Sequence, residues 1–212
     1  MNSIHHLRKD YKLRTLRKSD TNDDPFVQFL NWFNEATSSG IMEPNAMTLA
    51  TATKEGLPSA RIVLLKDFSN SGFTFFTNYN SKKGRQIAEN NAGVLLFFWQ
   101  ELERQVRIEG FIEKVSVEES EKYFISRPLG SQISAVVSQQ SSEVANRDLL
   151  EKNYNILYNK SQNELLVKPE NWGGYILKPN LLEFWQGRSN RLHDRIEYKI
   201  ENGKWMKRRL AP

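Results

Sequence analysis

The sequence predicts a mainly β fold with flanking helices, an antiparallel barrel or sandwich of the α+β class. Short apolar segments recur between turn residues, as in small barrels and sandwiches. Other segments carry apolar residues at helical spacing. The chain has 212 residues, 39% of them apolar, and includes 5 Trp, 7 Tyr and 12 Phe. This composition supplies a core for one domain with appendages and argues against wholesale disorder.

The first 22 residues are polar and basic, with six Lys and Arg residues against two Asp. This pattern is typical of a solvated, mobile tail. The alternative is an arm that closes over an anionic ligand. Nothing after it resembles a flexible linker, so residues 23–212 are predicted to form a single domain.

A helix is predicted directly after this arm. Asp24 can cap it, Pro25 suits its first position and Gly40 can end it. Apolar residues at helical spacing are its predicted core face: Phe26, Phe29, Leu30, Phe33 and Ala36.

The remaining elements follow from alternation and turn signals. Strands are expected over 47–53, 59–68, 73–78, 94–100 and 103–115, with a helix over 81–91 capped by Ser81. Residues 117–158 are predicted to be helical, with Ser116 as a cap and a break at Arg127-Pro128. Residues 172–210 are predicted strands with a hairpin turn at 201–204.

Several classes of function are excluded. Without cysteine there are no disulfides, Cys nucleophiles or Cys-ligated clusters, which fits a reducing, cytoplasmic location. Three histidines, two of them adjacent, argue against a metal site, so none is predicted. No dinucleotide or Walker A motif occurs. The longest apolar run, 94–99, is far short of the ~18 residues of a membrane span. The net charge of +5 favours anionic partners.

Three basic constellations are candidate sites. Arg61 and Lys66 flank an apolar strand and either reach solvent or bind phosphates; on a regular strand they point to opposite faces, unless a bulge intervenes. Lys82 and Lys83 stand at a predicted helix start, which is either an ordinary solvated start or a phosphate site.

The third constellation is the sequence RLHDR at 191–195. On a strand, Arg191, His193 and Arg195 would share one face, suited to binding an anion or stacking on a ring. A structural role for His193 is equally open. His193 and Asp194 would point apart and form no catalytic dyad.

These motifs occur in an order that resembles the pyridoxine/pyridoxamine 5′-phosphate oxidase family. The resemblance runs from about residue 6 to residue 212 and rests on RIVLLK (61–66), ERQVRIEG (103–110), SRPLGSQI (126–133), SQQSS (138–142), WGGY (172–175), EFWQG (183–187), RLHDR (191–195) and RLAP (209–212).

The resemblance implies a homodimeric, FMN-binding split β-barrel, with residues 172–212 contributing to dimerisation and to the active site. It implies oxidation of pyridoxamine 5′-phosphate and pyridoxine 5′-phosphate to pyridoxal 5′-phosphate by dioxygen, with release of hydrogen peroxide and, from the amine, ammonia. No nucleic acid or membrane is an expected partner.

The resemblance also implies site residues. The FMN site would comprise Arg61, Ile62, Val63, Leu64, Leu65, Lys66, Phe76, Thr77, Lys82, Lys83, Gln105, Gln140, Ser141, Trp185 and Arg195. The substrate site would comprise Arg8, Tyr11, Lys66, Tyr123, Arg127, Ser131, Arg191 and His193, the last two as catalytic residues. Lys82 and Phe76 depart from the family, in which arginine and tyrosine are common at these positions.

Other functions stay open at this point. One is another FMN split-barrel oxidase, such as one acting on phenazine precursors, which the substrate-phosphate set Lys66, Tyr123, Arg127 and Ser131 disfavours. A non-catalytic carrier of flavin or pyridoxal phosphate is a second. A basic nucleic-acid-binding protein is a third, although no recognition motif for nucleic acid is present.

Overall fold

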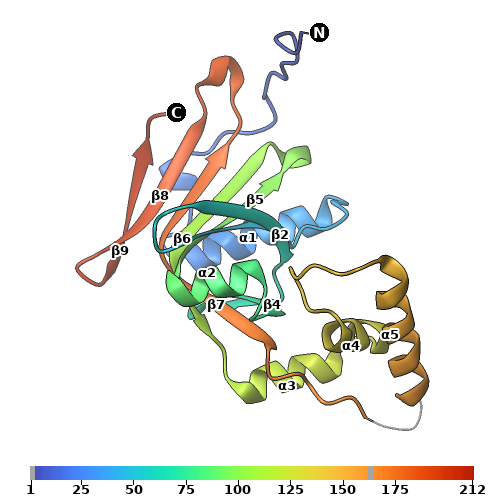
Figure 1. The fold of residues 1–212 in the computed structure, drawn as a ribbon. Coiled ribbons are helices and arrows are strands. Elements are labelled where there is room, and N and C mark those ends of the chain that lie inside the picture. The colour runs from blue at the N-terminus through green and yellow to red at the C-terminus, as the bar shows by residue number, and fades with distance from the viewer. Residues whose placement is uncertain (1–2, 162–164) are drawn as a thin grey trace. The chain divides into compact units, whose positions relative to one another are not determined.

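A computed structural model describes residues 3–161 and 165–212 (Figure 1). The first two residues of the predicted arm lie outside these ranges. The chain divides into two compact units. The first comprises Met1–Leu49, Val94–Gly110 and Pro179–Pro212, and the second comprises Ala50–Gly93 and Phe111–Lys178. That residues 23–212 act as one domain stays a prediction.

The described residues form five α-helices, three 3-10 turns and a nine-stranded sheet. The strands are β1 (Ala46–Ala52), β2 (Pro58–Leu64), β3 (Asp67–Ser69), β4 (Gly72–Asn78), β5 (Ala92–Trp99), β6 (Arg104–Lys114), β7 (Trp172–Gln186), β8 (Asp194–Glu201) and β9 (Lys204–Leu210). They pair in the order β2-β1-β5-β6-β7-β4-β3, with β8 on β7 and β9 on β8. The helices are α1 (Pro25–Ser38), α2 (Lys82–Glu89), α3 (Val117–Ser126), α4 (Leu129–Val137) and α5 (Arg147–Lys160). The 3-10 turns are η1 (Lys18–Asp20), η2 (Gln100–Leu102) and η3 (Ser189–Arg191).

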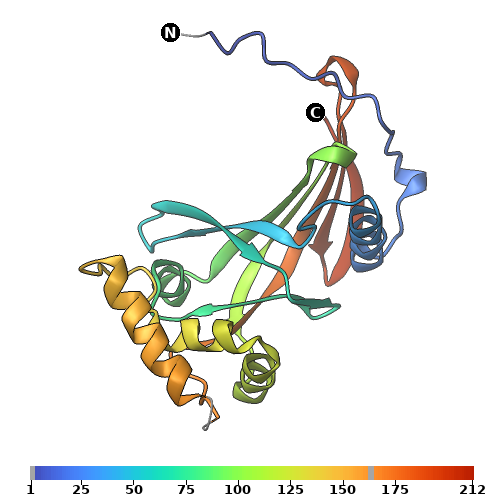
Figure 2. The ribbon, with the colours of Figure 1, turned by 90° about the vertical axis from the view of Figure 1, so that its right-hand side faces the viewer.

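The first unit is built around α1, which lies against the strands in Figure 2. The Asp24 carboxylate caps the helix by accepting hydrogen bonds from the Phe26 and Val27 amides, as predicted. Phe29 packs on Phe97 with ring centroids 5.3 Å apart, and Trp32 meets Phe184 edge-on at 5.2 Å. The prediction that Leu30 belongs to the core was wrong, because it is 42% exposed while Trp32 is buried.

The β8–β9 hairpin of the first unit has full antiparallel register from the Arg195–Leu210 pair to the Glu201–Lys204 pair. Its turn has positive φ at Asn202 and Gly203, 52° and 75°. This left-handed pair explains the Asn-Gly sequence at the predicted turn.

The second unit pairs β4 with β7 in antiparallel register, from Phe73–Leu177 to Asn78–Trp172. Helices α3, α4 and α5 gather at one end of it in Figure 1. Ser81 and Ser116 cap α2 and α3 as predicted, each accepting a hydrogen bond from the amide three residues on.

Two predicted strands differ in the structure. The strand expected over 59–68 ends at Leu64, and a separate β3 begins at Asp67. The strand geometry considered for RLHDR does not hold either, because β8 begins only at Asp194. Asn190 and Arg191 have left-handed backbones, with φ of 56° and 61°, so strand alternation does not relate Arg191 to the residues after it.

No helix among the described residues is long and apolar enough to cross a membrane.

Candidate functional site

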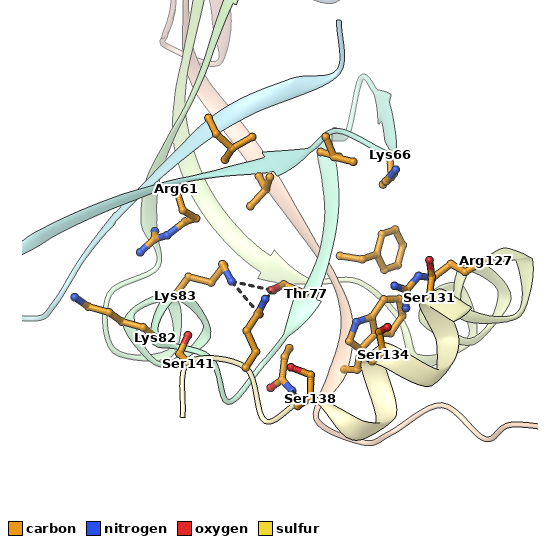
Figure 3. A pocket seen from close by; sticks show the side chains of 18 of the residues that line it. Arg61, Lys66, Thr77, Lys82, Lys83, Arg127, Ser131, Ser134, Ser138 and Ser141 are labelled. Carbon is orange, nitrogen blue, oxygen red and sulfur yellow. Dashed lines mark hydrogen bonds between the residues drawn. The ribbon is translucent and has the colours of Figure 1, made fainter. Parts of the chain in front are cut away.

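The second unit contains a cavity of about 900 Å³ (Figure 3). Residues of β2, β4, α2, α3 and α4 and of the segment after α4 line it. Five cationic side chains and no Asp or Glu are among its described lining residues; the cations are Arg61, Lys66, Lys82, Lys83 and Arg127. Positive charge gathered without carboxylates suits an anionic ligand.

One end of the cavity carries Arg61, Lys82 and Lys83 (Figure 3). Lys82 and Lys83 lie at the start of α2, and Lys82 is exposed while Lys83 is buried. The Lys83 ammonium donates hydrogen bonds to three uncharged oxygens: Gln140 Oε1 at 3.0 Å, Thr77 Oγ1 at 3.1 Å and Ser81 Oγ at 3.4 Å. Thr77 Oγ1 in turn donates to Gln140 Oε1 at 3.1 Å.

The surroundings of Lys83 disfavour its protonated, charged form. Burial, with the neighbouring charge of Arg61, lowers the pKa of Lys83 from 10.5 to about 8. A bound dianion would favour the protonated ammonium and reverse this shift. The electrostatics at the start of α2 therefore suit the anion that the phosphate-site prediction places there.

The opposite end of the cavity carries Lys66, Arg127 and Ser131 (Figure 3). Arg127 stacks over the Trp172 ring, with its guanidinium carbon 4.6 Å from the ring centroid. Among the described residues, Arg127 Nη1 is the one buried side-chain nitrogen or oxygen that has no hydrogen-bond partner. Burial also lowers the Arg127 pKa. A buried, unsatisfied donor on a cation indicates that a ligand acceptor completes the site.

An aromatic stack lies at this end. Phe76 stacks on Tyr123 with centroids 3.9 Å apart, and on Trp172 at 5.7 Å. Phe76, a predicted residue of the FMN site, thus lines the cavity beside Tyr123, and its side chain can contribute only by packing.

Most predicted residues of this unit line the cavity. Ile62, Val63, Leu64, Gln140 and Ser141 do so as well. Leu65 does not: it is 4% exposed and lies outside the lining set. Because the strand ends at Leu64, Arg61 and Lys66 line the same cavity at different ends.

The other predicted residues lie in the first unit. Trp185 and His193 face each other with ring centroids 4.7 Å apart, and Tyr11 of the arm contacts both, at 5.7 and 6.0 Å. Gly187 makes this possible, since a Cβ there would lie 2.7 Å from the Tyr11 ring. The arm residue Tyr11 is thus packed on its unit, while Arg8 is exposed.

His193 is held in one tautomer. Its Nδ1 accepts a hydrogen bond from the Arg188 amide at 3.1 Å, so the neutral ring carries its proton on Nε2. Burial and the nearby charge of Arg191 lower the His193 pKa. At neutral pH the ring is therefore a hydrogen-bond donor through Nε2, beside the exposed Arg191.

Arg195, unlike Lys83, is held by a carboxylate. Its Nε and Nη2 donate to both oxygens of Glu183 at 2.8 and 2.9 Å, and Nη1 donates to the Ala211 carbonyl at 2.8 Å. Gln105, on β6, is half-buried in the same unit. The predicted FMN contacts of both residues stay predictions.

Some lining residues were missed by the sequence analysis. Ser134, Ala135 and Ser138 line the cavity along α4. The signal was present, because Ser131, Ser134 and Ser138 recur at spacings of three and four residues and so share a helix face. Trp172 also lines the cavity, although the sequence analysis named it only within the WGGY motif and the predicted strands and not as a site residue. No group of His, Asp or Glu within the described ranges has the arrangement of a metal site.

Comparison with known proteins agrees with this geometry. Residues 33–159 match the family described as "Pyridoxamine 5'-phosphate oxidase", and residues 172–212 match "Pyridoxine 5'-phosphate oxidase C-terminal dimerisation region". A "Pyridoxine/pyridoxamine 5'-phosphate oxidase" of Gloeothece citriformis is 53% identical over 211 residues, covering 99% of each chain. The chain therefore belongs to the pyridoxamine 5′-phosphate oxidase family, a family of oxidoreductases.

Two solved structures share the fold. PhzG from Burkholderia lata, in complex with tetrahydrophenazine-1-carboxylic acid, has a TM-score of 0.89 and 29% identity, covering 94% of this chain and 99% of its own. A pyridoxamine 5′-phosphate oxidase-related, FMN-binding protein from Nostoc punctiforme has a TM-score of 0.73 and 14% identity, covering 91% and 100%. The predicted fold class, an antiparallel split barrel with flanking helices, is confirmed.

Proposed function

We propose that this protein uses FMN to oxidise pyridoxamine 5′-phosphate and pyridoxine 5′-phosphate to pyridoxal 5′-phosphate, with dioxygen as the final acceptor. The amine would consume one O₂ and one water and release ammonia and hydrogen peroxide; the alcohol would consume one O₂ and release hydrogen peroxide. Family membership supports the reaction class. The carboxylate-free cavity with cations at both ends is the observation that carries the proposal.

The two ends of the cavity suit two phosphorylated ligands. Arg61, Lys82 and Lys83 would hold the FMN phosphate, and Lys66, Arg127 and Ser131 the substrate phosphate, with Tyr123 beside them. The unsatisfied Arg127 Nη1 is a donor for the second phosphate. When bound, FMN supplies a two-electron acceptor for hydride, which dioxygen reoxidises.

Arg191 and His193 would hold the substrate ring over the flavin. The His193 Nε2 proton, fixed by the Arg188 amide, is available to the hydroxyl oxygen that the substrate's pyridine ring carries. The chemistry then depends on position rather than on strong acid or base, because the transferred hydride leaves a carbon that must face the flavin.

The direct test follows both products. Protein loaded with FMN is given pyridoxamine 5′-phosphate in air, and pyridoxal 5′-phosphate and hydrogen peroxide are measured together. Appearance of both in equal amounts supports the proposal. Bound FMN with neither product would make the substrate assignment wrong.

A second candidate substrate class comes from the likeness to PhzG, whose bound molecule is a phenazine precursor. The Arg127 and Lys66 end of the cavity favours a phosphorylated substrate instead. A panel of phosphorylated pyridines and dihydrophenazine carboxylates separates the two.

The Arg191→Ala variant tests the catalytic assignment. We expect turnover to fall by about a hundredfold, because the substrate loses a charged contact over the flavin, while FMN affinity stays unchanged. Unchanged turnover would remove Arg191 from this role.

We also propose a homodimer, since residues 172–212 match the family's dimerisation region. Light scattering of the FMN-loaded protein tests it, and a monomer mass would contradict it.

A further inference from the structure

A small polar network lies behind Arg61 in the second unit. It joins Thr51 on β1, Ser59 on β2 and Gln86 on α2, three residues that the sequence analysis did not single out. Thr51 and Gln86 are buried, with exposed fractions of 3% and 4%. Two buried polar side chains, on β1 and α2, are costly unless their hydrogen bonds are satisfied, so this arrangement requires an explanation.

The hydrogen bonds form a chain from Arg61 through Thr51 and Gln86 to Ser59, each residue donating to the next. Arg61 Nη1 donates to Thr51 Oγ1 at 2.6 Å, and that hydroxyl donates to Gln86 Oε1, also at 2.6 Å. The Gln86 amide nitrogen donates to Ser59 Oγ at 3.1 Å. Arginine can only donate, so the amide oxygen of Gln86 is the end that faces the guanidinium, and the amide nitrogen is left to donate to Ser59. Arg61 Nη2 also approaches that oxygen, at 3.4 Å.

These contacts orient Arg61 through uncharged oxygens. Lys83, at the same end of the cavity, is likewise held by uncharged oxygens, those of Thr77, Ser81 and Gln140. A glutamate in place of Gln86 could accept the same bonds from Arg61 and Thr51. It would also add a negative charge beside the cavity, where it would repel a phosphate and attract the guanidinium.

We propose that Gln86 and Thr51 are positioning residues for the phosphate of FMN: they fix the Arg61 guanidinium toward the cavity without neutralising its charge. This inference rests on the proposed function, because it takes the anion at this end to be the FMN phosphate. The neutrality of residue 86, rather than its hydrogen bonding alone, is the property that the proposal requires.

The experiment compares two flavins that differ only in the phosphate. Dissociation constants of FMN and of riboflavin are measured by calorimetric titration of the flavin-free protein. The variants are Gln86→Glu, which adds charge but keeps size, and Thr51→Val, which removes the hydroxyl but keeps shape. Arg85→Gln is the matched control, since it makes the same change in net charge on the exposed face of the same helix.

The expected result is selective for the phosphate. Gln86→Glu weakens FMN binding at least about tenfold, because a new charge stands near the phosphate, and changes riboflavin binding less than about twofold. Thr51→Val weakens FMN binding about three- to tenfold, the net effect of one typical hydrogen bond, because Arg61 loses a contact that orients it. Arg85→Gln changes both affinities less than about twofold, because exposed charges are screened.

Several outcomes overturn the inference. If Gln86→Glu binds FMN as tightly as the parent protein does, a neutral side chain at position 86 is not required. Equal weakening of FMN and riboflavin in Gln86→Glu and in Thr51→Val would assign both residues a purely structural role. A parent protein that does not prefer FMN over riboflavin would instead overturn the proposed function, and this inference with it. If Gln86→Glu misfolds, Thr51→Val still tests whether this network orients Arg61 for the phosphate, and FMN binding by Thr51→Val as tight as that of the parent protein then overturns the inference.

Discussion

The cavity of the second unit and the Glu183 cluster of the first unit differ in the partners of their cationic side chains. The cluster consists of Glu183, Arg195, Arg107 and Glu109. In the cavity, five cations share the lining with no carboxylate among the described residues. In the cluster, the buried Glu183 carboxylate binds Arg195 at both of its oxygens and Arg107 Nη2 at 2.6 Å, and Arg107 also pairs with Glu109. Arginine that is paired with a carboxylate within the protein stabilises the fold, whereas Lys83, which donates to uncharged oxygens, can pair its charge with a ligand.

The two regions also have opposite effects on the charged forms of their groups. In the cavity, burial dominates and lowers the pKa of Lys83 and Arg127. In the cluster, burial alone would raise the Glu183 pKa, but hydrogen bonds from Arg195 and Arg107 outweigh it and leave the pKa below its ordinary value. The Arg195 pKa is correspondingly raised, chiefly by its hydrogen bond to Glu183. The charged forms are thus disfavoured in the cavity and favoured in the cluster.

The largest expected effect comes from removing a cavity cation. Arg127→Ala should raise KM for pyridoxamine 5′-phosphate about a hundredfold, because a buried charge-assisted contact to phosphate is lost. Its effect on kcat should be smaller. Steady-state kinetics measure both, with Arg147→Ala on the exposed face of α5 as the control. An unchanged KM would mean that the substrate phosphate binds elsewhere.

Removing the carboxylate of the cluster should act on stability instead. Glu183→Gln is expected to lower the free energy of unfolding by about 2 kcal/mol, because it removes the buried charge that Arg195 and Arg107 share. Urea unfolding measures this loss. Because the folded-state pKa lies below that of the unfolded chain, the Glu183 contribution is present above the unfolded value and lost as the pH falls through the folded one. A parallel loss at pH 7 and at pH 3 would contradict this account.

The pH dependence of FMN binding sharpens the comparison. With a Lys83 pKa of about 8, the ammonium of the flavin-free protein loses its proton above pH 8, so FMN affinity should fall by up to about tenfold per pH unit there. The stability of the flavin-free protein should change in the other direction. The pKa of Lys83 in the folded protein lies below its unfolded value of 10.5. The contribution of Lys83 to the free energy of unfolding therefore becomes more favourable as the pH rises from 8 towards 10.5.

Lys83→Arg is the control for this pH effect, because arginine keeps its charge over the whole range. Titrations with FMN at several pH values should show a flatter profile for this variant. The same slope in both proteins would assign the pH dependence to another group.

The smallest effect is expected at an exposed pair. Lys178 Nζ and Glu113 Oε2 lie 2.6 Å apart, and the two side chains are 54% and 51% exposed. Lys178→Ala should change the free energy of unfolding by at most about 0.5 kcal/mol, since solvent screens such pairs. A loss as large as that of Glu183→Gln would show that pairing, rather than burial, dominates the stabilisation.

Local elements were largely predictable from the sequence. Asp24, Ser81 and Ser116 were assigned as helix caps, and the Asn202-Gly203 turn as a hairpin, because each depends on residues only a few positions apart. The strand geometry considered for RLHDR failed for the same reason. Alternation assumes a regular strand, and the left-handed backbone at Asn190 and Arg191 breaks it.

Most cavity cations were candidates from the sequence. The pattern of basic residues pointed to Arg61, Lys66, Lys82 and Lys83, the resemblance to the family added Arg127, and the structure places all five on one cavity. Their assigned ligand contacts stay predictions. The sequence held no signal for Gln86 or Thr51, because a neutral side chain is informative only when its cationic partner is known.

By itself, then, the sequence determined the class of fold, the caps and turns, the excess of positive charge and the family. The tertiary structure decided which cations meet carboxylates and which do not. That distinction depends on contacts between residues far apart in the chain, such as Arg107 with Glu183 or Thr51 with Gln86. Composition counts charges, but only their placement in three dimensions decides which of them the fold neutralises.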